Sequence, residues 1–260
     1  MWKEGSRVMV GVSGGKDSML TLHVLSAIRE KENIEVAAFH LDLSIPDYSS
    51  PSLDTIRKYT EDNDVPLFTY SLSKEWGMSL GEIAETLGRK PCSLCGLLKR
   101  YYLLKTAVKE GFDVVATGHN MDDILSFFLY NAATGGKRYF PSLLPKVKTI
   151  VGVIKVRPLY YLDENRIRKE VEALQVPYFP GKCPFSSMAP TGKIRKFLQE
   201  MEEERPGFKK TLLKFFLDVA RQTPAEKPGK CKICGMPSSG EVCSVCKIKM
   251  KLGLDPKKLF

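Results

Sequence analysis

Residues 8–18 read Val8-Met9-Val10-Gly11-Val12-Ser13-Gly14-Gly15-Lys16-Asp17-Ser18 and combine three kinds of local signal. The first five residues are mostly β-branched, which is typical of a buried strand. Two glycines then break the run, and apolar residues return with helical spacing between Met19 and Leu25. Glycines let the backbone approach a ligand closely, consecutive N–H groups form an anion nest, and a helix N-terminus adds positive potential. A tight turn without a ligand is the alternative, but we predict a phosphate site here.

The charged and hydroxyl side chains of this loop also favour a phosphate ligand. Lys16 adds a point charge, and Ser13 and Ser18 offer hydroxyl hydrogen bonds. The spacing is not that of G-x-x-x-x-G-K-[ST], which excludes the common P-loop. The run Ser13–Ser18 resembles the pyrophosphate loop of the PP-loop ATPases, or N-type ATP pyrophosphatases. That resemblance implies cleavage of ATP between its α and β phosphates and adenylation of an oxygen of a second substrate. The implied ATP-binding residues are Gly11, Val12, Ser13, Gly14, Gly15, Lys16, Asp17 and Ser18.

Strand and helix patterns alternate along most of the chain. Further strands are predicted at residues 34–43, 66–70, 111–117 and 149–156. Helices are predicted at residues 53–62, from residues 90–92 onward, at residues 124–133 and at residues 208–219. A further helix is predicted after a cap at Asp163, with Ile167, Val171 and Leu174 on one face. This alternation predicts an α/β fold with a doubly wound parallel sheet, and the PP-loop resemblance implies its adenine nucleotide alpha hydrolase-like form.

Polar residues follow two of the predicted strands at their carboxyl ends, where open α/β sheets bind ligands. Asp42 ends the second strand and is predicted to lie near the nucleotide, although a solvated strand-end carboxylate is the alternative. Residues 118–123 follow the fourth strand and read Gly118-His119-Asn120-Met121-Asp122-Asp123. The adjacent carboxylates suit Mg²⁺ carried on ATP. They also suit the acidic first turn of a helix, and the two interpretations are compatible.

The seven cysteines are predicted to be metal or catalytic ligands, since the chain is expected in a reducing compartment. Cys92 and Cys95 form one C-x-x-C pair that opens a helix, and redox, zinc and iron–sulfur chemistry all remain open for it. Cys183 stands alone, and a single cysteine is most often a small buried apolar group. Two further C-x-x-C pairs, Cys231/Cys234 and Cys243/Cys246, predict a closed, structural Cys₄ zinc site that supplies much of the folding free energy of the tail.

Length and composition limit the function classes. The 260 residues allow one large domain with a small appendage, and 43% hydrophobic residues indicate a globular protein. No apolar run approaches the roughly 18 residues that span a bilayer, and residues 1–5 leave no room for a signal peptide, so we expect a cytoplasmic protein. The net charge of +10 suits a polyanion such as RNA, although a solvated basic surface is the alternative.

Taken together, the motifs resemble the TtcA/TtuA/NcsA family of tRNA 2-thiolation enzymes, with the TtuA-like branch favoured by the Cys₄ tail. The resemblance covers nearly the whole chain and rests on Ser13–Ser18, Cys92/Cys95 with Lys99 one turn later, residues 118–123, Cys183 and the Cys₄ pairs. It implies three domains, at residues 1–185 (PP-loop catalytic), 186–222 (helical extension) and 223–260 (zinc-binding).

The resemblance also implies a mechanism. Cys92, Cys95 and Cys183 would bind a [4Fe–4S] cluster whose fourth iron stays open for hydrosulfide. The C2 oxygen of a pyrimidine, uridine above all, would attack the α-phosphate of ATP, and sulfide would then displace AMP. Gly118 and Asp42 would contact ATP, Mg²⁺ would lie near Asp17 or Asp123, and Lys99 and Asp123 would be catalytic.

The partners implied are tRNA, a ubiquitin-like sulfur-carrier protein or free sulfide as the sulfur donor, and a second copy of the chain in a homodimer. This sequence departs from the usual family pattern in lacking an N-terminal zinc finger, in the loop after Asp42 and in residues 124–126. Two other function classes remain: a PP-loop enzyme that adenylates a substrate other than tRNA, and a non-catalytic RNA-binding module with a redox-sensing cluster.

Overall fold

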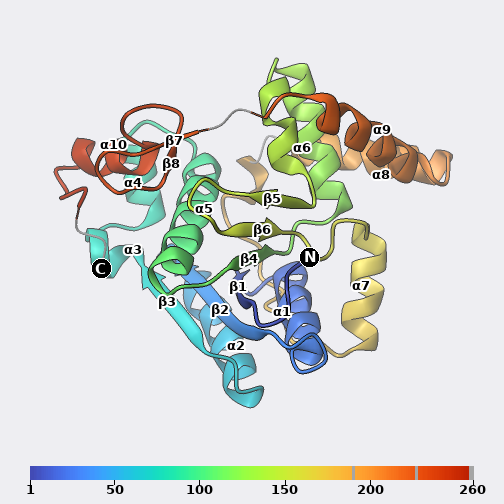
Figure 1. Cartoon of the computed structure of the whole chain (residues 1–260), viewed down its shortest axis with the longest axis horizontal. Helices are drawn as coiled ribbons and strands as arrows, with labels where there is room; N and C mark the ends of the chain where they lie inside the picture. The colour runs from blue at the N-terminus through green and yellow to red at the C-terminus, as the bar shows by residue number, and fades with distance from the viewer. Residues whose placement is uncertain (189–190, 226–227, 258–260) are drawn as a thin grey trace.

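The computed structural model describes residues 1–188, 191–225 and 228–257, and its centre is a six-stranded sheet. The strand order is β3-β2-β1-β4-β6-β5, and all neighbouring pairs are parallel except β5 and β6. The strands are β1 (Arg7–Val12), β2 (Glu35–Asp42), β3 (Leu67–Ser71), β4 (Val114–Thr117), β5 (Lys146–Lys148) and β6 (Ile154–Val156). The predicted α/β fold with a doubly wound, mostly parallel sheet is therefore confirmed (Figure 1).

Helices surround the sheet in the predicted alternation. The α-helices are α1 (Lys16–Ile28), α2 (Ser49–Asp62), α3 (Leu72–Trp76), α4 (Leu80–Thr86), α5 (Pro91–Lys109), α6 (Met121–Ala133), α7 (Glu164–Ala173), α8 (Gly192–Glu204), α9 (Phe208–Gln222) and α10 (Ser244–Lys251). Two 3₁₀ helices are η1 (Lys137–Leu143) and η2 (Ser186–Met188), and a small hairpin joins β7 (Gly229–Lys230) to β8 (Pro237–Ser238). No described helix is both long and apolar enough to cross a membrane.

The predicted strand at residues 149–156 is wrong in its first half. Residues 149–152 form a turn in which the Gly152 N–H donates to the Thr149 carbonyl at 3.1 Å, and Gly152 has φ +90°. This turn makes an antiparallel hairpin of β5 and β6, so the edge of the sheet is not parallel. The β-branched residues before the glycine suggested a continuous strand, whereas glycine's access to positive φ allows the reversal.

Two of the three residues predicted to share one face of α7 are buried. Ile167 and Val171 lie on the buried face of α7. Asp163 caps this helix, as expected, because its side chain accepts the Arg166 N–H at 2.8 Å. Leu174, however, is 46% exposed. The helix ends at Ala173, so Leu174 leaves the apolar stripe before its side chain can reach the core.

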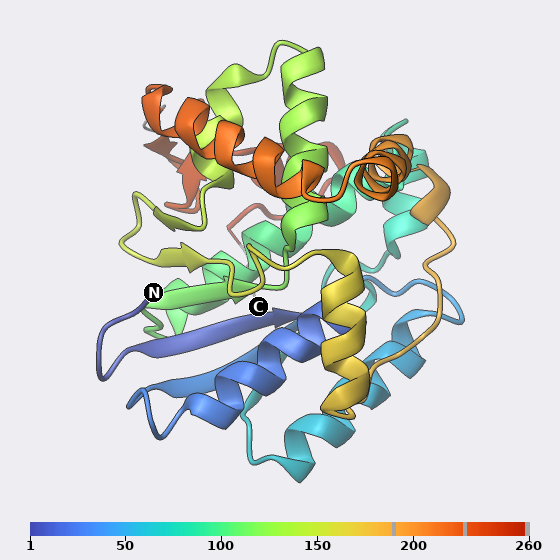
Figure 2. The same cartoon turned by 90° about the vertical axis from the view of Figure 1, so that its right-hand side faces the viewer.

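The alternation of side chains along β1 assigns the two faces of the sheet to different helices. Val8 and Val10 pack in a cluster with residues of α1, α2 and α7, whereas Met9 packs in a cluster with residues of α5. Figure 2 shows α1 and α7 in front of the strands and α5 behind them. The strands β1, β2 and β4 are buried on both faces, which explains why they read as continuous apolar runs.

A third cluster joins α6, η1, α8 and α9 at one end of the sheet (Figure 1). Phe128, Phe140 and Phe216 form its centre, with ring centroids of Phe128 and Phe216 4.8 Å apart. The predicted helix at residues 208–219 therefore packs into a core, as expected for an amphipathic pattern. Beneath this cluster, the Lys209 ammonium lies 2.5 Å from a carboxylate oxygen of Asp122, and both side chains are buried.

The C-terminal Cys₄ segment, residues 229–251, packs on α5. Met236 and Val245 belong to the same apolar cluster as Leu98 of α5, and the Lys105 ammonium donates to the Cys234 carbonyl at 3.0 Å. We call residues 229–251 the knuckle. Its apolar contacts with α5 help to stabilise the knuckle. The domain division at residues 185/186 and 222/223 stays a prediction.

Candidate active site

The phosphate loop joins β1 to α1 in a conformation that requires glycine. Gly14 has φ +75°, and a Cβ there would lie 2.4 Å from the Ser52 hydroxyl and 3.0 Å from the Ser52 carbonyl oxygen. The loop is also held internally, since the Ser13 N–H donates to the Ser18 hydroxyl at 3.1 Å and that hydroxyl donates to the Gly15 carbonyl at 2.9 Å. The sequence thus builds a rigid backbone cradle that leads into the N-terminus of α1.

Two further glycines let neighbouring elements approach this cradle. A Cβ on Gly118, just after β4, would lie 2.8 Å from the backbone carbon and oxygen of Asp17. A Cβ on Gly11 would lie 2.9 Å from a methyl carbon of Leu103 on α5. The motif at residues 118–123 and the phosphate loop, which are about a hundred residues apart in the sequence, are therefore in direct contact.

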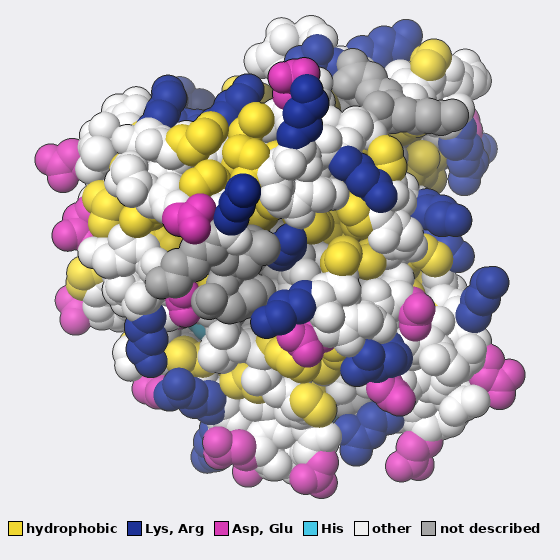
Figure 3. Space-filling model, turned by 60° about the vertical axis from the view of Figure 1, so that its left-hand side comes forward, with side chains coloured by type: hydrophobic (Ala, Val, Ile, Leu, Met, Phe, Trp, Pro, Cys, Tyr) yellow, Lys and Arg dark blue, Asp and Glu magenta, His cyan; other side chains and the backbone are white. Residues whose placement is uncertain are grey.

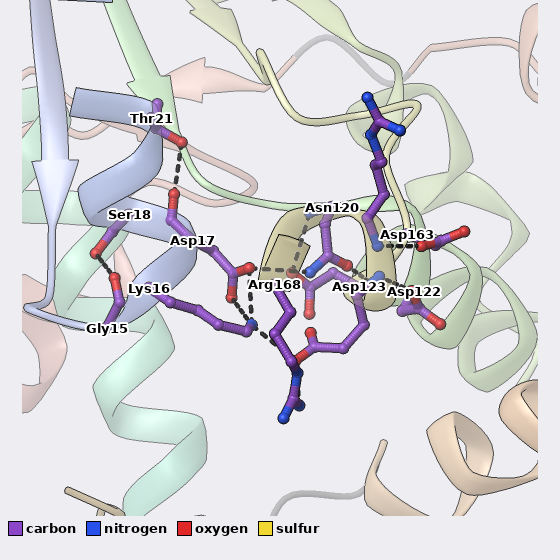
Figure 4. Close-up of polar contacts among 12 residues, drawn as sticks. Gly15, Lys16, Asp17, Ser18, Thr21, Asn120, Asp122, Asp123, Asp163 and Arg168 are labelled. Carbon is purple, nitrogen blue, oxygen red and sulfur yellow. Dashed lines mark hydrogen bonds and ion pairs between the residues drawn. The ribbon is translucent and has the colours of Figure 1, made fainter. Parts of the chain in front are cut away.

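Charges meet at the start of α1. The Lys16 ammonium lies 3.0 Å from an Asp17 carboxylate oxygen and 2.7 Å from a Glu164 carboxylate oxygen (Figure 4). Burial opposes the charge on Lys16, but these two carboxylates outweigh it and raise the pKa of the ammonium. Burial raises the pKa of the Asp17 carboxyl despite the nearby Lys16. Sequence reasoning missed Glu164, because it lies on α7, far from the loop along the chain.

The two adjacent carboxylates of α6 have different environments. Asp123 caps the helix reciprocally with Asn120 and forms an ion pair with Arg195 of α8. Asp122 instead accepts the Glu164 N–H at 2.8 Å and pairs with the buried Lys209. Of the two, only Asp123 borders the cavity described below. Burial raises the pKa of the Asp123 carboxyl, although the nearby Arg195 guanidinium acts in the opposite direction. Asp122 therefore holds α6, α7 and α9 together.

A cavity of about 390 Å³ brings most of the predicted site residues together. Its lining includes Gly11, Val12, Ser13, Gly15, Asp17, Ser18, Lys99, Gly118 and Asp123. Lys99 enters from α5, and among the described residues none forms a hydrogen bond or ion pair with its ammonium. Gly14, Lys16 and Asp42 lie outside the lining; the Asp42 carboxylate accepts the Ser44 N–H at 2.7 Å and the Ser71 hydroxyl at 3.0 Å.

The cavity also contains residues that sequence reasoning did not select, among them His119, Arg100 and Arg195. A ring nitrogen of His119 lies 2.8 Å from the Thr117 hydroxyl. Burial and the nearby guanidiniums of Arg157, Arg100 and Arg195 lower the pKa of His119 to about 3, so the imidazole is neutral near pH 7. The motif around His119 could have indicated that residue, whereas no local pattern distinguished the two arginines from other basic surface residues.

The three remaining cysteines outside the knuckle converge at the N-terminus of α5. Cys92 and Cys95 occupy its first turn, and the Cys92 thiol donates to the Phe185 carbonyl at 2.9 Å, two residues beyond Cys183. Partial burial raises the pKa of the Cys92 thiol, and Cys95 and Cys183 lie close enough to raise it further. The segment carrying Cys183 is tied to the phosphate loop by a 2.8 Å hydrogen bond from the Phe179 N–H to the Gly14 carbonyl.

The four cysteines of the knuckle fit a single ion. Their sulfur atoms all lie within 4.8 Å of one another, and the Cys231–Cys246 and Cys234–Cys243 separations are 3.9 and 3.7 Å. Four thiolates at about 2.3 Å around a tetrahedral ion would be about 3.8 Å apart. This donor set can therefore hold a soft, tetrahedral metal ion with no open position.

Comparisons with known proteins agree with this geometry. A family model described as a PP-loop domain matches residues 2–187. The chain is 36% identical over 248 residues to the tRNA-5-methyluridine(54) 2-sulfurtransferase of Pyrococcus horikoshii, covering 93% of this chain and 77% of that protein. It is 32% identical over 251 residues to the enzyme of the same name from Thermus thermophilus, covering 94% and 76%.

A solved structure extends the likeness over the whole chain. The U34-tRNA thiolase NcsA from Methanococcus maripaludis, solved with its [4Fe–4S] cluster, superimposes with a TM-score of 0.86. The match covers 99% of this chain and 85% of that one, at 26% sequence identity. The similarity therefore includes the knuckle and the segment that carries the cluster-forming cysteine candidates.

Proposed function

Because the chain belongs to the TtcA/TtuA/NcsA family of PP-loop tRNA 2-thiolation enzymes, we propose that it is an ATP-dependent tRNA sulfurtransferase. It would exchange the C2 oxygen of a pyrimidine, uridine above all, for sulfur. The observation that carries the proposal is one cavity that holds the phosphate loop, Lys99 and Asp123 against a helix whose first turn carries Cys92 and Cys95.

The phosphate loop and its neighbours would bind ATP. The backbone cradle at Ser13–Ser18 suits the β and γ phosphates, and Gly118 and Asp42 at neighbouring strand ends would frame the nucleotide. Mg²⁺ would replace the Lys16 ammonium as the partner of Asp17, with Asp123 as a second carboxylate ligand. A divalent ion would also favour the ionised form of both carboxyls, which burial now disfavours.

In the first step, the C2 oxygen of the base attacks the α-phosphorus of ATP, and the bond to pyrophosphate breaks. Negative charge then increases on the α-phosphate oxygens, and an unpaired ammonium on a rigid helix can stabilise it without reorganisation. Lys99 has these properties. Asp123, when ionised, would hold the metal or accept a proton from the base. The base becomes an adenylate, and a sulfur nucleophile then displaces AMP from C2.

Cys92, Cys95 and Cys183 fit a cluster with three protein thiolates. They converge at the N-terminus of α5, the helix that also lines the cavity, and the positive potential of this helix end favours thiolates. When bound there, a [4Fe–4S] cluster would supply an open iron position for the sulfur nucleophile. The protein's own contribution would be to fix this position relative to the phosphate loop, through the Phe179–Gly14 hydrogen bond.

The remaining parts of the proposal concern the knuckle and the partners. Zn²⁺ would occupy Cys231, Cys234, Cys243 and Cys246, because it prefers a closed tetrahedral thiolate set. The basic surface suits tRNA as the substrate in the cytoplasm. The sulfur would come from free sulfide or a ubiquitin-like carrier protein, and the chain would act as a homodimer.

The test is tRNA-dependent cleavage of ATP. Protein reconstituted with iron and sulfide under anaerobic conditions should release AMP and pyrophosphate only when unmodified tRNA is present. Lys99→Ala should lower the turnover by roughly 10²–10³-fold. Lys109→Ala, on the exposed end of the same helix, should leave it unchanged. Rapid pyrophosphate release without tRNA would contradict the proposal and favour adenylation of another substrate.

A further inference from the structure

A second hollow lies between the knuckle, α5 and strand β6. Its volume is about 520 Å³, and its lining includes Arg100 and Tyr101 of α5, Lys155 of β6, and Ser244 and Lys247 of α10. We call it the knuckle groove. Figure 3 shows the side of the molecule that carries the knuckle, where Lys and Arg side chains recur across the surface, with acidic side chains among them.

The knuckle groove has a strongly one-sided charge. Three of its lining side chains, Arg100, Lys155 and Lys247, are cationic, and none is acidic. In the described ranges 1–188, 191–225 and 228–257, none of these three cations forms an ion pair with a carboxylate. Burial, with Arg157 and Arg100 nearby, lowers the pKa of Lys155 to about 8. Cations held together without a counter-charge are unfavourable unless an anion binds among them.

The groove and the active-site cavity share a wall. Arg100 lines both hollows, and Lys99, the adjacent residue, lines the cavity alone. Successive residues on a helix point about 100° from one another, so Lys99 and Tyr101, two residues apart, point about 200° apart. The helix α5 can therefore present Lys99 to the cavity and Tyr101 to the groove. A ligand in the knuckle groove would therefore be continuous with a ligand in the cavity, with the Arg100 guanidinium between them.

We propose that the knuckle groove binds a phosphodiester of the substrate RNA that flanks the nucleoside held in the cavity. This inference rests on the proposed function, since it takes the base in the cavity to be part of an RNA. Lys155 and Lys247 contact the phosphate oxygens, and Arg100 holds the phosphate between groove and cavity. The knuckle thus closes one wall of an RNA site.

The distribution of donors favours RNA over the carboxylate terminus of a protein. The cations come from three separate elements, α5, β6 and α10, whereas a single terminal carboxylate needs one compact set of donors. The groove also offers the Ser244 hydroxyl, which suits the acceptor oxygens of a sugar–phosphate chain. Its volume falls in the range of sites that take a group of nucleotide size.

The experiment measures the binding of unmodified tRNA to the full-length protein as a function of salt concentration, by fluorescence anisotropy. Lys155→Gln and Lys247→Gln should each weaken binding by roughly three- to tenfold at low salt, and each should reduce the slope of log K against log salt by about 1. Lys155→Arg keeps the positive charge and should leave both the tRNA affinity and the salt slope at their wild-type values. The matched control is Lys58→Gln, on the exposed surface of α2, which should change neither.

The outcomes separate this inference from the proposed function. An unchanged salt slope in both glutamine variants would overturn the groove as an RNA site, even if the wild-type protein thiolates tRNA. If the glutamine variants showed the reduced slope but the wild-type protein did not thiolate tRNA, the groove would be supported as an RNA site and the proposed function would be contradicted. The glutamine variants could also bind tRNA normally, lose sulfur transfer from a protein thiocarboxylate and keep sulfur transfer from free sulfide. That result would assign the groove to a carrier protein and overturn the proposal.

Discussion

The buried ion pair beneath α6 offers a sharp test of how the active-site carboxylate is held. The Lys209 side chain is 2% exposed and that of Asp122 is 6% exposed, and their charged atoms lie 2.5 Å apart. The Lys209 ammonium also donates to the Gln199 side chain at 3.0 Å, and Asp122 accepts the Glu164 N–H. One carboxylate thus connects α6 with α7 and α9, directly next to Asp123.

Replacing Lys209 with Met keeps much of the side-chain volume and removes the charge. Asp122 would then be buried with a single N–H donor, and an unpaired buried charge of this kind costs about 3–5 kcal/mol. For a chain of this size, that loss corresponds to a drop in unfolding temperature of roughly 6–20 °C. Thermal unfolding followed by circular dichroism measures it. Lys210→Met is the matched control, because Lys210 is exposed on the same helix.

A double variant separates the charge from the packing. Asp122→Asn with Lys209→Met removes both charges and keeps an acceptor for the Glu164 N–H, so at least about 2 kcal/mol of the loss should return. The reasoning would be refuted if Lys209→Met unfolded within about 1 kcal/mol of Lys210→Met. It would also be refuted if the double variant were no more stable than the single one.

Three further predictions follow from the geometry. Gly14→Ala should weaken ATP binding by about tenfold or more, measured by titration calorimetry, because its Cβ would collide with α2. Gly5→Ala has a similar positive φ in open space and should leave ATP affinity unchanged; equal effects would contradict the role of the collision. The pKa of buried His40 is lowered by burial to about 4, so the unfolded chain binds an extra proton below about pH 6.5, and stability falls as the pH falls. Between pH 7 and 5, His40 should account for about 2 kcal/mol of the loss in urea unfolding, so the loss in His40→Asn should be smaller by about that amount; equal losses would contradict it. Chelation of the knuckle metal, or Cys243→Ser, should lower the unfolding temperature by about 5 °C or more, whereas Ser239→Ala should not; an unchanged temperature after verified metal loss would contradict a structural metal.

The order of elements was predictable because strands buried on both faces leave long apolar runs. The runs of β1, β2 and β4 identified the parallel core of the sheet, and the glycine pair at residues 14–15 located the loop after β1. The hairpin of β5 and β6 was not predictable by the same means. Its turn contains two apolar β-branched residues, Ile150 and Val151, and only the positive φ of Gly152 interrupts a pattern that otherwise reads as one strand.

The candidate site was predictable where its residues lie within one motif. The phosphate loop and Asp123 border one cavity, as their places at strand ends suggested. Glu164 and Arg195 were missed because they reach the site from α7 and α8, through tertiary contacts that leave no local pattern. Asp122 shows the opposite case. Its place in the sequence, next to Asp123 and after a strand, suited a metal ligand, but its carboxylate is already paired with the buried Lys209 of α9.

The most direct test of the central claim is nucleoside mass spectrometry of tRNA after reaction. Protein reconstituted anaerobically with iron and sulfide should convert unmodified tRNA to a product containing a 2-thio nucleoside when ATP is present. The mass should correspond to replacement of one oxygen by sulfur, and the product should be absent with Cys183→Ala. An intact cluster and ATP turnover without any thio nucleoside would contradict the assignment and direct attention to an acceptor other than tRNA.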